Sequence, residues 1–434
     1  MSSAGSLAAA LGHDARDPLA PLRARFALPR DGGGEPLVYL CGHSLGLLPL
    51  AALERVNEEL AAWADHAVQA HEHGGRPWVP YHENLTAGLA ALSGARPLEV
   101  VAMNSLTVNL HLMLASFYRP QGQRTRILIE AGAFSSDRHA VTSQLAWHGL
   151  DPQSALLELA PPEGGATIHE EAIEAVLAER GAEVALVLWP GVQFRTGQAF
   201  DIARIVRAAH GAGAIAGFDL AHSMGNTPLS LHDADADFAV WCSYKYLNGG
   251  PGAIGGCFVH QRHSEAQPRT SHGGTLPGTR LAGWWGHEQH TRFLMEPQFR
   301  AAAGAAAWQI SNPPILAAAP LIASLSIFLE AGMQALRDKS IALTGFLEEL
   351  LRPLSAEVQI LTPREPDRRG CQLSLRLVGG EQRGKRVFDA LAARGIVCDW
   401  RSPDIIRVAP VPLYNRFEDA WRFAQALSET LPAG

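Results

Sequence analysis

The chain lacks the sequence features that mark secreted, membrane-spanning and nucleic-acid-binding proteins. Its five cysteines are scattered over 434 residues without a C-x-x-C pair, which favours free thiols in a reducing compartment over a disulfide framework. No apolar stretch reaches the length of about 18 residues that a membrane span requires. The N-terminus has no basic signal-peptide start, and Lys and Arg form no basic tract. We therefore expect a cytoplasmic protein that binds neither membrane nor nucleic acid.

The remaining composition is typical of a globular protein with more than one domain. Hydrophobic residues make up 47% of the chain, and a net charge of −7 is spread along it. Apolar runs of strand length alternate with helical patterns to about residue 260, which predicts an α/β fold with a mostly parallel sheet. From residue 357 the pattern becomes α+β. We expect an N-terminal segment (1–50) that packs with the small domain, a large domain (51–312), and a small C-terminal domain with its linking helix (313–434).

The same patterns predict the individual elements. Strands are expected at 37–40, 126–130, 184–189, 214–218, 237–241, 255–260, 358–361, 371–377 and 405–408. Helices are expected at 53–70, 108–117, 202–210, 315–351, 384–394 and 417–430. Residues 264–283 are polar and rich in glycine, which indicates a long surface loop.

The stretch 217–250 carries the strongest chemical signal. Asp219 ends a buried strand and His222 follows it, whereas Tyr244 and Lys245 follow the next strand. Ligands of open α/β sheets bind beyond the carboxyl ends of strands. A lysine that can form a Schiff base and an acid that can pair with a pyridinium nitrogen suit pyridoxal phosphate. The alternatives are a solvated surface lysine, an aspartate that only caps a helix, and a metal site in which Asp219 and His222 are ligands.

One predicted helix start resembles an anion site. Asn104-Ser105-Leu106-Thr107 introduces a helix, where free N–H groups and the helix dipole favour a phosphate, although serine and threonine there also serve as caps. Phe134 follows a strand, with Ser135, Ser136 and Asp137 after it. Its ring could stack on a flat ligand or pack in the core.

Other polar residues stand in loops or in unusual positions. Ser44 lies in the turn Gly42-His43-Ser44-Leu45-Gly46, which could bind a ligand or simply turn the chain. His71 and His73 could form a metal pair or line a pocket. Arg407 interrupts an apolar strand, so it needs a partner, either a substrate carboxylate or a structural carboxylate.

Six segments resemble the kynureninases, which are fold-type I pyridoxal phosphate enzymes related to the class V aminotransferases. These segments are FDLAHSMGN, CSYKYLNGG, GWWGHE, ISNPPIL, RGCQLSL and IRVAPVPLYN, and the resemblance runs from about residue 37 to the C-terminus. It implies a large, mostly parallel sheet of the seven-stranded type and a smaller α+β domain. Two positions depart from the family motifs, because His43 replaces the usual Asn and Ser135 the usual Pro.

The resemblance also implies roles for particular residues. Lys245 would form the Schiff base, Asp219 would contact the pyridine nitrogen, and Tyr244 would contact the phosphate and donate a proton. Further cofactor residues would be Leu106, Thr107, Phe134, Ser135, Ser136, Asp137, His222, Trp284 and Asn312, the last two reaching the neighbouring subunit's cofactor. Substrate residues would be Ser44, His71, Trp285, Ser311, Asn312 and Arg407. We expect no metal, and we expect a homodimer with shared active sites.

The implied reaction is hydrolytic cleavage of the β,γ carbon–carbon bond of kynurenine or 3-hydroxykynurenine, in tryptophan catabolism and NAD biosynthesis. Free Lys245 would remove the α-proton, and an anthranilate and alanine would be released. Competing hypotheses are a cysteine desulfurase-like lyase, a metal hydrolase and a non-catalytic cofactor-binding homologue. The desulfurase-like lyase would need a nucleophilic cysteine in a mobile loop, and none of the five cysteines lies in an evident mobile loop.

Four residues indicate a preference between the two substrates. The family branch that prefers 3-hydroxykynurenine has a His before G-x-R-P-W and Ser-Asn before Pro-Pro, which here are His71, Ser311 and Asn312. An imidazole and an amide can hydrogen-bond a ring hydroxyl. Trp285 stands where that branch usually has Phe, so the aromatic wall is kept but is bulkier. We predict that 3-hydroxykynurenine is preferred; the alternative is that His71 only caps a helix and the pocket accepts either substrate.

Overall fold

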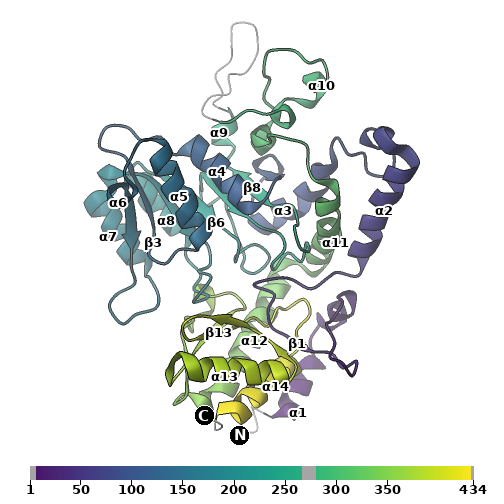
Figure 1. The fold of residues 1–434 in the computed structure, drawn as a ribbon, viewed down its shortest axis with the longest axis vertical. Coiled ribbons are helices and arrows are strands. Elements are labelled where there is room, and N and C mark those ends of the chain that lie inside the picture. Colours follow the sequence, from purple (N-terminus) through teal and green to yellow (C-terminus); the bar gives the residue numbers. More distant parts are fainter. Residues whose placement is uncertain (1–5, 266–279, 432–434) are drawn as a thin grey trace.

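The computed structural model describes residues 6–265 and 280–431, so most of the loop predicted at 264–283 lies outside the described residues. Its main layer is a seven-stranded sheet in the order β2-β8-β7-β6-β5-β3-β4 (Figure 1). The strands are β2 (Val100–Ala102), β3 (Arg126–Glu130), β4 (Leu156–Leu159), β5 (Val184–Pro190), β6 (Ile215–Asp219), β7 (Phe238–Trp241) and β8 (Gly256–Val259). β8 is antiparallel to both neighbours and the other pairs are parallel, which confirms the predicted sheet.

Helices cover both faces of this sheet because successive side chains of a buried strand point to opposite sides. Ile127 and Ile129 pack in one apolar cluster with residues of α4 and α5, whereas Leu128 packs in another with residues of α7 and α8. The helices of this part are α2 (Ala51–His66), α3 (Thr86–Ser93), α4 (Leu106–Phe117), α5 (Ser135–Trp147), α6 (Pro152–Ala155), α7 (Glu170–Arg180), α8 (Ile202–Gly211), α9 (Arg262–Glu265), α10 (Gln289–Arg292) and α11 (Ile315–Ala331). The carboxyl ends of the parallel strands are left open for a site.

A smaller antiparallel sheet lies below the large one in Figure 1, in the order β12-β13-β10-β9. Its strands are β9 (Val358–Ile360), β10 (Leu373–Leu377), β12 (Asp399–Arg401) and β13 (Ile405–Val408), and its helices are α12 (Met333–Leu351), α13 (Gly380–Ala393) and α14 (Phe417–Thr430). The predicted strands and helices of this region are present. β12, like β4 in the large sheet, was not predicted, because each is short and half-exposed rather than a clear apolar run.

The N-terminal segment lies against this smaller sheet. Helix α1 (Leu7–Asp14) packs on α14, and β1 (Val38–Tyr39) pairs in parallel with β11 (Ile396–Val397). Val38 and Leu40 share an apolar cluster with residues of β10, β13 and α14. Leu19, Leu22, Phe26 and Leu47 pack instead in the apolar cluster that contains Leu128 and Phe218 of the large sheet. The association of residues 1–50 with the small domain and the boundaries at 50 and 312 therefore stay predictions.

Two predicted helices are shorter than their apolar patterns suggested. The helix predicted at 315–351 is two helices, α11 and α12, which meet at Gly332 with a bend of 82°. Gly332 has φ +74°, a conformation that glycine adopts readily and that ends a helix. The helix predicted at 53–70 ends as α2 at residue 66, and Ala67–His71 continue as a 3₁₀ turn. Ala67 stands at this break with φ +48°.

No single helix in the two described ranges, 6–265 and 280–431, combines the length and apolar composition needed to cross a membrane. Helices α11 and α12 meet that test only when joined, and the 82° bend separates them.

Candidate active site

The two residues that carried the strongest sequence signal meet at one edge of the large sheet. β6 ends at Asp219, and Lys245 follows its parallel neighbour β7. Lys245 Nζ lies 3.0 Å from His222 Nε2. An ammonium group has only donors, so Nε2 of His222 accepts and the ring proton is on Nδ1. Burial, and next the charge of Lys245, hold the pKa of His222 well below its ordinary value, which keeps the ring neutral.

A cradle for an anion adjoins this pair. Thr107 is in the first turn of α4 and Ser136 in the first turn of α5, and their hydroxyl oxygens lie 2.7 Å apart. Gly255 runs so close to this turn that an added Cβ would be 3.2 Å from the Leu106 nitrogen. Two helix starts and two hydroxyl groups therefore face the same place, which fits a phosphate group.

Three carboxyl groups line the cavity beside Lys245, from Glu130, Asp137 and Asp219. Burial, and next the carboxyl of Asp219, raise the pKa of Asp137 well above its ordinary value. Burial raises the pKa of Glu130 to about 8, and a hydrogen bond from the Gln193 amide opposes that shift. The backbone N–H of Ala221 donates to Asp219 Oδ1 at 2.6 Å. The raised pKa values favour the protonated forms of Asp137 and Glu130, so this wall would carry a single carboxylate charge. One such charge suits a cationic ring nitrogen.

Aromatic side chains form the cavity's other walls. Phe134 is 42% exposed, so it is not a core residue, and its ring meets Phe194 edge to face at 5.4 Å. Lys245 Nζ lies 5.9 Å from the ring centres of Phe134 and of Tyr244. An exposed ring at a cavity wall favours the stacking role over the packing alternative.

Most of the residues assigned to the cofactor line this one cavity: Leu106, Thr107, Phe134, Ser136, Asp137, Asp219, His222, Tyr244 and Lys245. Ser135 is exposed and does not line it. Sequence reasoning missed Glu130, Trp189, Val192 and Phe194, which also line it. A charged residue closing the apolar strand β3 was the available signal for Glu130, because carboxyl ends of strands form this site.

Arg407 reaches the same region from the small sheet. Its Nε and Nη2 lie 2.7 and 2.6 Å from Asp399 Oδ2, and Nη1 donates to the Phe194 carbonyl at 2.6 Å. Nη2 also lies 3.5 Å from the Ser44 hydroxyl. The structural salt bridge that we considered is therefore present, and Asp399 is a partner that sequence reasoning missed. Asp399 therefore takes both Nε and Nη2, and Nη1 bonds the Phe194 carbonyl at the cavity wall.

The remaining predicted residues gather in a second hollow. His71, Trp284, Trp285 and Asn312 line it, and Ser311 donates to Asn312 Oδ1 at 3.1 Å. No residue lines both this hollow and the cavity around Lys245. Within one chain the structure thus divides the predicted site into a cavity around Lys245 and a hollow around His71.

The metal alternatives find no support in the described residues. There, groups of three side chains close enough to share an ion are Cys41, His43 and Asp399, and Glu99, His232 and His260. Neither contains the pair Asp219 and His222 or the pair His71 and His73.

Comparisons with known proteins extend these observations. A family profile described as "Kynureninase C-terminal domain" matches residues 336–427. A kynureninase of Stenotrophomonas maltophilia is 56% identical to this chain over 98% of both proteins. The kynureninases of Xanthomonas euvesicatoria and Xanthomonas campestris are 56% and 57% identical, and cover 97% and 95% of the chain.

Solved structures share the fold at low sequence identity. A variant of C-DES with glycine covalently linked to its pyridoxal phosphate cofactor superposes with a TM-score of 0.74 at 18% identity, covering 93% of this chain and 98% of that one. The cysteine desulfurase CsdA of Escherichia coli gives 0.72 at 18% identity, covering 96% and 98%. These likenesses confirm the predicted fold type.

Proposed function

The chain belongs to the kynureninase family, and we propose that it hydrolyses the β,γ carbon–carbon bond of 3-hydroxykynurenine and kynurenine in tryptophan catabolism and NAD biosynthesis. The products are 3-hydroxyanthranilate or anthranilate, with alanine. Family membership makes the chain a hydrolase with pyridoxal phosphate as its cofactor. The observation that best supports the proposal is the meeting of Lys245, His222 and Asp219 in one cavity beside the anion cradle.

Bound pyridoxal phosphate supplies an electron sink for this chemistry. Asp219 would hold a proton on the cofactor's ring nitrogen, because a neighbouring carboxylate favours the cationic form. Lys245 would be the base for the α-proton, and neutral His222 accepts a hydrogen bond from the lysine amine. Burial raises the pKa of Tyr244 well above its ordinary value, so its phenol keeps a proton to donate.

Arg407 binds the substrate carboxylate in this proposal. Asp399 and the Phe194 carbonyl hold the guanidinium beside Ser44, and all three of its nitrogens have partners within the chain. A substrate carboxylate would therefore share or replace a partner at the Nη groups, where a guanidinium can bond it with two N–H groups.

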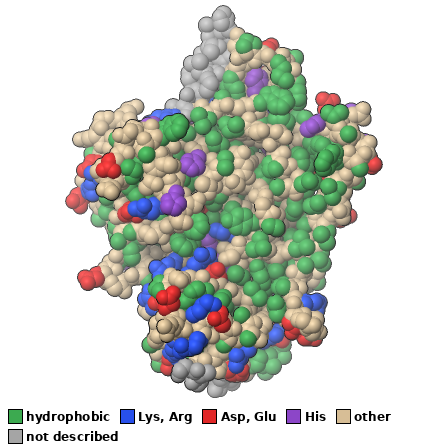
Figure 2. All heavy atoms as spheres, in the orientation of Figure 1, with side chains coloured by type: hydrophobic (Ala, Val, Ile, Leu, Met, Phe, Trp, Pro, Cys, Tyr) green, Lys and Arg blue, Asp and Glu red, His purple; other side chains and the backbone are tan. Residues whose placement is uncertain are grey.

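The hollow around His71 completes the active site of a second subunit in the proposed homodimer. Its surroundings are apolar and exposed: Val68 is 77%, Phe293 52% and Trp284 46% exposed. On α2, Leu53 and Trp63 are also exposed, and Figure 2 shows hydrophobic side chains gathered where Figure 1 places this helix. An apolar surface of this kind is typical of a subunit interface.

Preference for 3-hydroxykynurenine rests on the polar groups of that hollow. His71 and Asn312 line it together with Trp285, so an imidazole and an amide stand beside an aromatic wall. A site built to bond a ring hydroxyl disfavours the substrate without one, since its polar groups then stay unpaired.

Product analysis tests the function. Purified protein is supplied with kynurenine and 3-hydroxykynurenine in parallel, and anthranilate, 3-hydroxyanthranilate and alanine are quantified. We expect equal molar amounts of alanine and the matching anthranilate, faster from 3-hydroxykynurenine. Absence of both products would overturn the proposal, and faster kynurenine cleavage would overturn only the preference.

The similarity to solved cysteine desulfurase structures supports a shared fold but not a shared reaction. Four of the five cysteines are buried, Cys41 is half-buried, and none lines the cavity around Lys245. Sulfur transfer needs an accessible thiolate at the reacting atoms. The observed cavity therefore favours carbon–carbon hydrolysis.

A further inference from the structure

Arg292 is a buried arginine that bonds the turn carrying Trp284, Trp285 and His287. It ends helix α10 and is 6% exposed. Its Nη2 donates to the carbonyl oxygens of Trp285 and His287, both at 2.9 Å, and its Nε donates to the His287 carbonyl at 3.3 Å. Its own carbonyl accepts the indole N–H of Trp284 at 3.1 Å. One residue thus holds the backbone of the turn and the side chain of Trp284.

The guanidinium of Arg292 also stacks on Trp285, with 4.5 Å between its central carbon and the ring centre. Trp285 is 3% exposed, and Trp284 meets its ring edge to face at 5.3 Å. A planar cation on an indole face is a favourable contact that fixes the ring's tilt as well as its position. Arg292 is therefore in contact with both tryptophans of the hollow around His71.

The turn that carries the tryptophans has little freedom elsewhere. A Cβ at Gly283 would lie 2.2 Å from the Ile310 carbonyl oxygen, and one at Gly286 would lie 2.6 Å from the Ala307 carbonyl oxygen. The backbone is thus pressed against residues 307–310 on one side and held by Arg292 on the other. The turn is therefore closely packed, and Arg292 is one of the residues that hold it in place.

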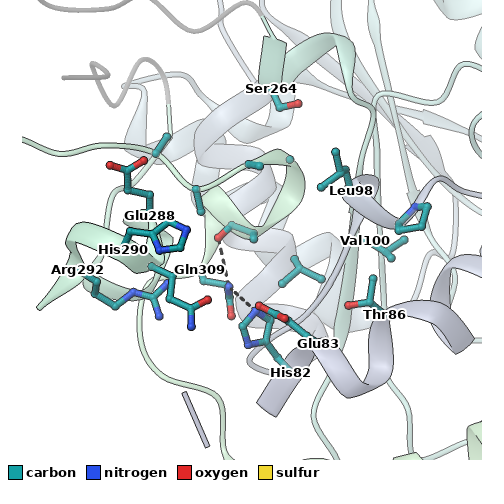
Figure 3. A pocket seen from close by; sticks show the side chains of 18 residues that line it. His82, Glu83, Thr86, Leu98, Val100, Ser264, Glu288, His290, Arg292 and Gln309 are labelled. Carbon is teal, nitrogen blue, oxygen red and sulfur yellow. Dashed lines mark hydrogen bonds between the residues drawn. The ribbon is translucent and has the colours of Figure 1, made fainter. Parts of the chain in front are cut away.

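Arg292 also faces a separate pocket. Figure 3 shows it among the side chains that line this pocket, with His82, Glu83 and Gln309. Burial lowers the pKa of Arg292, and the carboxylate of Glu83 opposes that shift. The Gln309 amide lies 3.2 Å from His82 Nε2, so this wall is a bonded polar group rather than open surface.

We propose that Arg292 is a positioning residue that sets the enzyme's selectivity for the aryl end of its substrate by fixing Trp285. The proposal rests on the proposed function, in which Trp285 forms the aromatic wall beside His71 and Asn312 of the hollow. Arg292 does not line that hollow and acts only through the tryptophans. A wall held at one tilt distinguishes two rings that differ by a hydroxyl group, whereas a loose wall accepts both.

The test compares Arg292→Lys with Arg280→Lys in the holoenzyme. Arg280 is a matched control, because it is 5% exposed and its guanidinium lies 4.7 Å above Trp308, outside the hollow. We expect Arg292→Lys to raise KM about tenfold, to change kcat less than about threefold, and to lower the ratio of kcat/KM for 3-hydroxykynurenine over kynurenine about fivefold. Arg280→Lys should leave that ratio unchanged.

A second readout does not depend on turnover. Binding of 3-hydroxyanthranilate and anthranilate, followed by quenching of tryptophan fluorescence, should lose selectivity in Arg292→Lys and keep it in Arg280→Lys. Arg292→Gln serves if the lysine variant does not fold. Equal selectivity in the Arg292 and Arg280 variants would overturn the inference, whereas a wild type that cleaves neither substrate would overturn the proposed function instead.

A double-mutant cycle separates positioning from general loss of structure. If Arg292 acts through Trp285, Arg292→Lys should change the selectivity ratio much less in a Trp285→Phe background than in the wild type. Additive effects of the two substitutions on that ratio would contradict the inference.

Discussion

The cavity around Lys245 and the hollow around His71 differ in how far one chain completes them. In and beside the cavity, charged side chains have partners within the chain: half-buried Lys245 lies 3.0 Å from His222, and buried Arg407 lies 2.6 Å from Asp399. Buried charges persist only with such partners. The charged groups of this region are therefore held in place by contacts within one chain.

The hollow is built from the opposite kind of surface. Trp284 and Phe293 are about half exposed, and the polar groups of His71 and Asn312 stand among apolar neighbours. In a single chain this apolar surface stays exposed to water, which is unfavourable. If the proposed homodimer forms, the reacting groups come from one subunit and the groups that recognise the aryl ring come from the other.

Lys245→Ala should have the largest effect. Without its amine the cavity has no base for the α-proton and no attachment for the cofactor, so turnover should fall on the order of ten-thousandfold or more. The measurement is kcat with 3-hydroxykynurenine, together with the visible absorbance of the purified protein. Activity close to the wild-type level would show that the reacting amine lies elsewhere.

Mixing variants then tests whether the two regions serve one site. Lys245→Ala and Trp284→Ala are unfolded together and refolded in equal amounts. Random pairing makes half the dimers mixed, and each mixed dimer has one intact site, so roughly a quarter of wild-type activity should return. Activity that never exceeds that of the separate variants would contradict shared sites.

Asp219→Asn should have the next largest effect. The amide cannot hold a proton on the ring nitrogen, so α-proton removal should slow roughly a hundred- to a thousandfold with little change in fold. Rapid-mixing kinetics of α-deuterated substrate measure that step directly. Glu130→Gln is the control, because it removes a neighbouring buried carboxyl group from the same wall. A larger loss from the control would give Glu130 the role assigned to Asp219.

The cavity could be predicted from sequence because its residues follow regular elements. Asp219, Lys245 and Thr107 stand at strand ends or helix starts, where apolar periodicity and the parallel sheet fix their positions. The apolar strands β3, β5, β6, β7 and β8 were predictable for the same reason, whereas β2, β4 and helices α3, α5 and α7 were not predicted. Breaks such as Gly332 were not, since the apolar pattern continues through them.

Contacts between distant segments could not be predicted. Asp399, the partner of Arg407, lies in a short half-exposed strand without an apolar pattern. Phe194 receives a bond from Arg407 through its backbone carbonyl, which no side-chain pattern reports. Such partners depend on how the two sheets are placed, and that placement is a property of the whole fold.

Arg407→Lys should have a moderate effect. The lysine keeps the charge but cannot bond Asp399, the Phe194 carbonyl and a substrate carboxylate together, so KM should rise roughly ten- to a hundredfold, about 1.4–2.7 kcal/mol. Arg401→Lys is the control, because Arg401 also bonds Asp399, at 3.0 Å, but is more exposed. Equal KM values for the two variants would show that Arg407 acts only on Asp399.

His71→Trp should have the smallest effect and concerns only the hollow. The indole fills the space where an imidazole could bond the ring hydroxyl. The ratio of kcat/KM for 3-hydroxykynurenine over kynurenine should therefore fall roughly tenfold, while kcat for the better substrate changes only a few-fold. His66→Trp adds the same bulk at the end of α2, outside the hollow, and should leave the ratio unchanged. Specificity constants for both substrates are measured in the three proteins. If His71 only caps its 3₁₀ turn, the ratio will match in all of them. A change confined to His71→Trp would show that substrate choice is made in the hollow, apart from the buried cavity that performs the reaction.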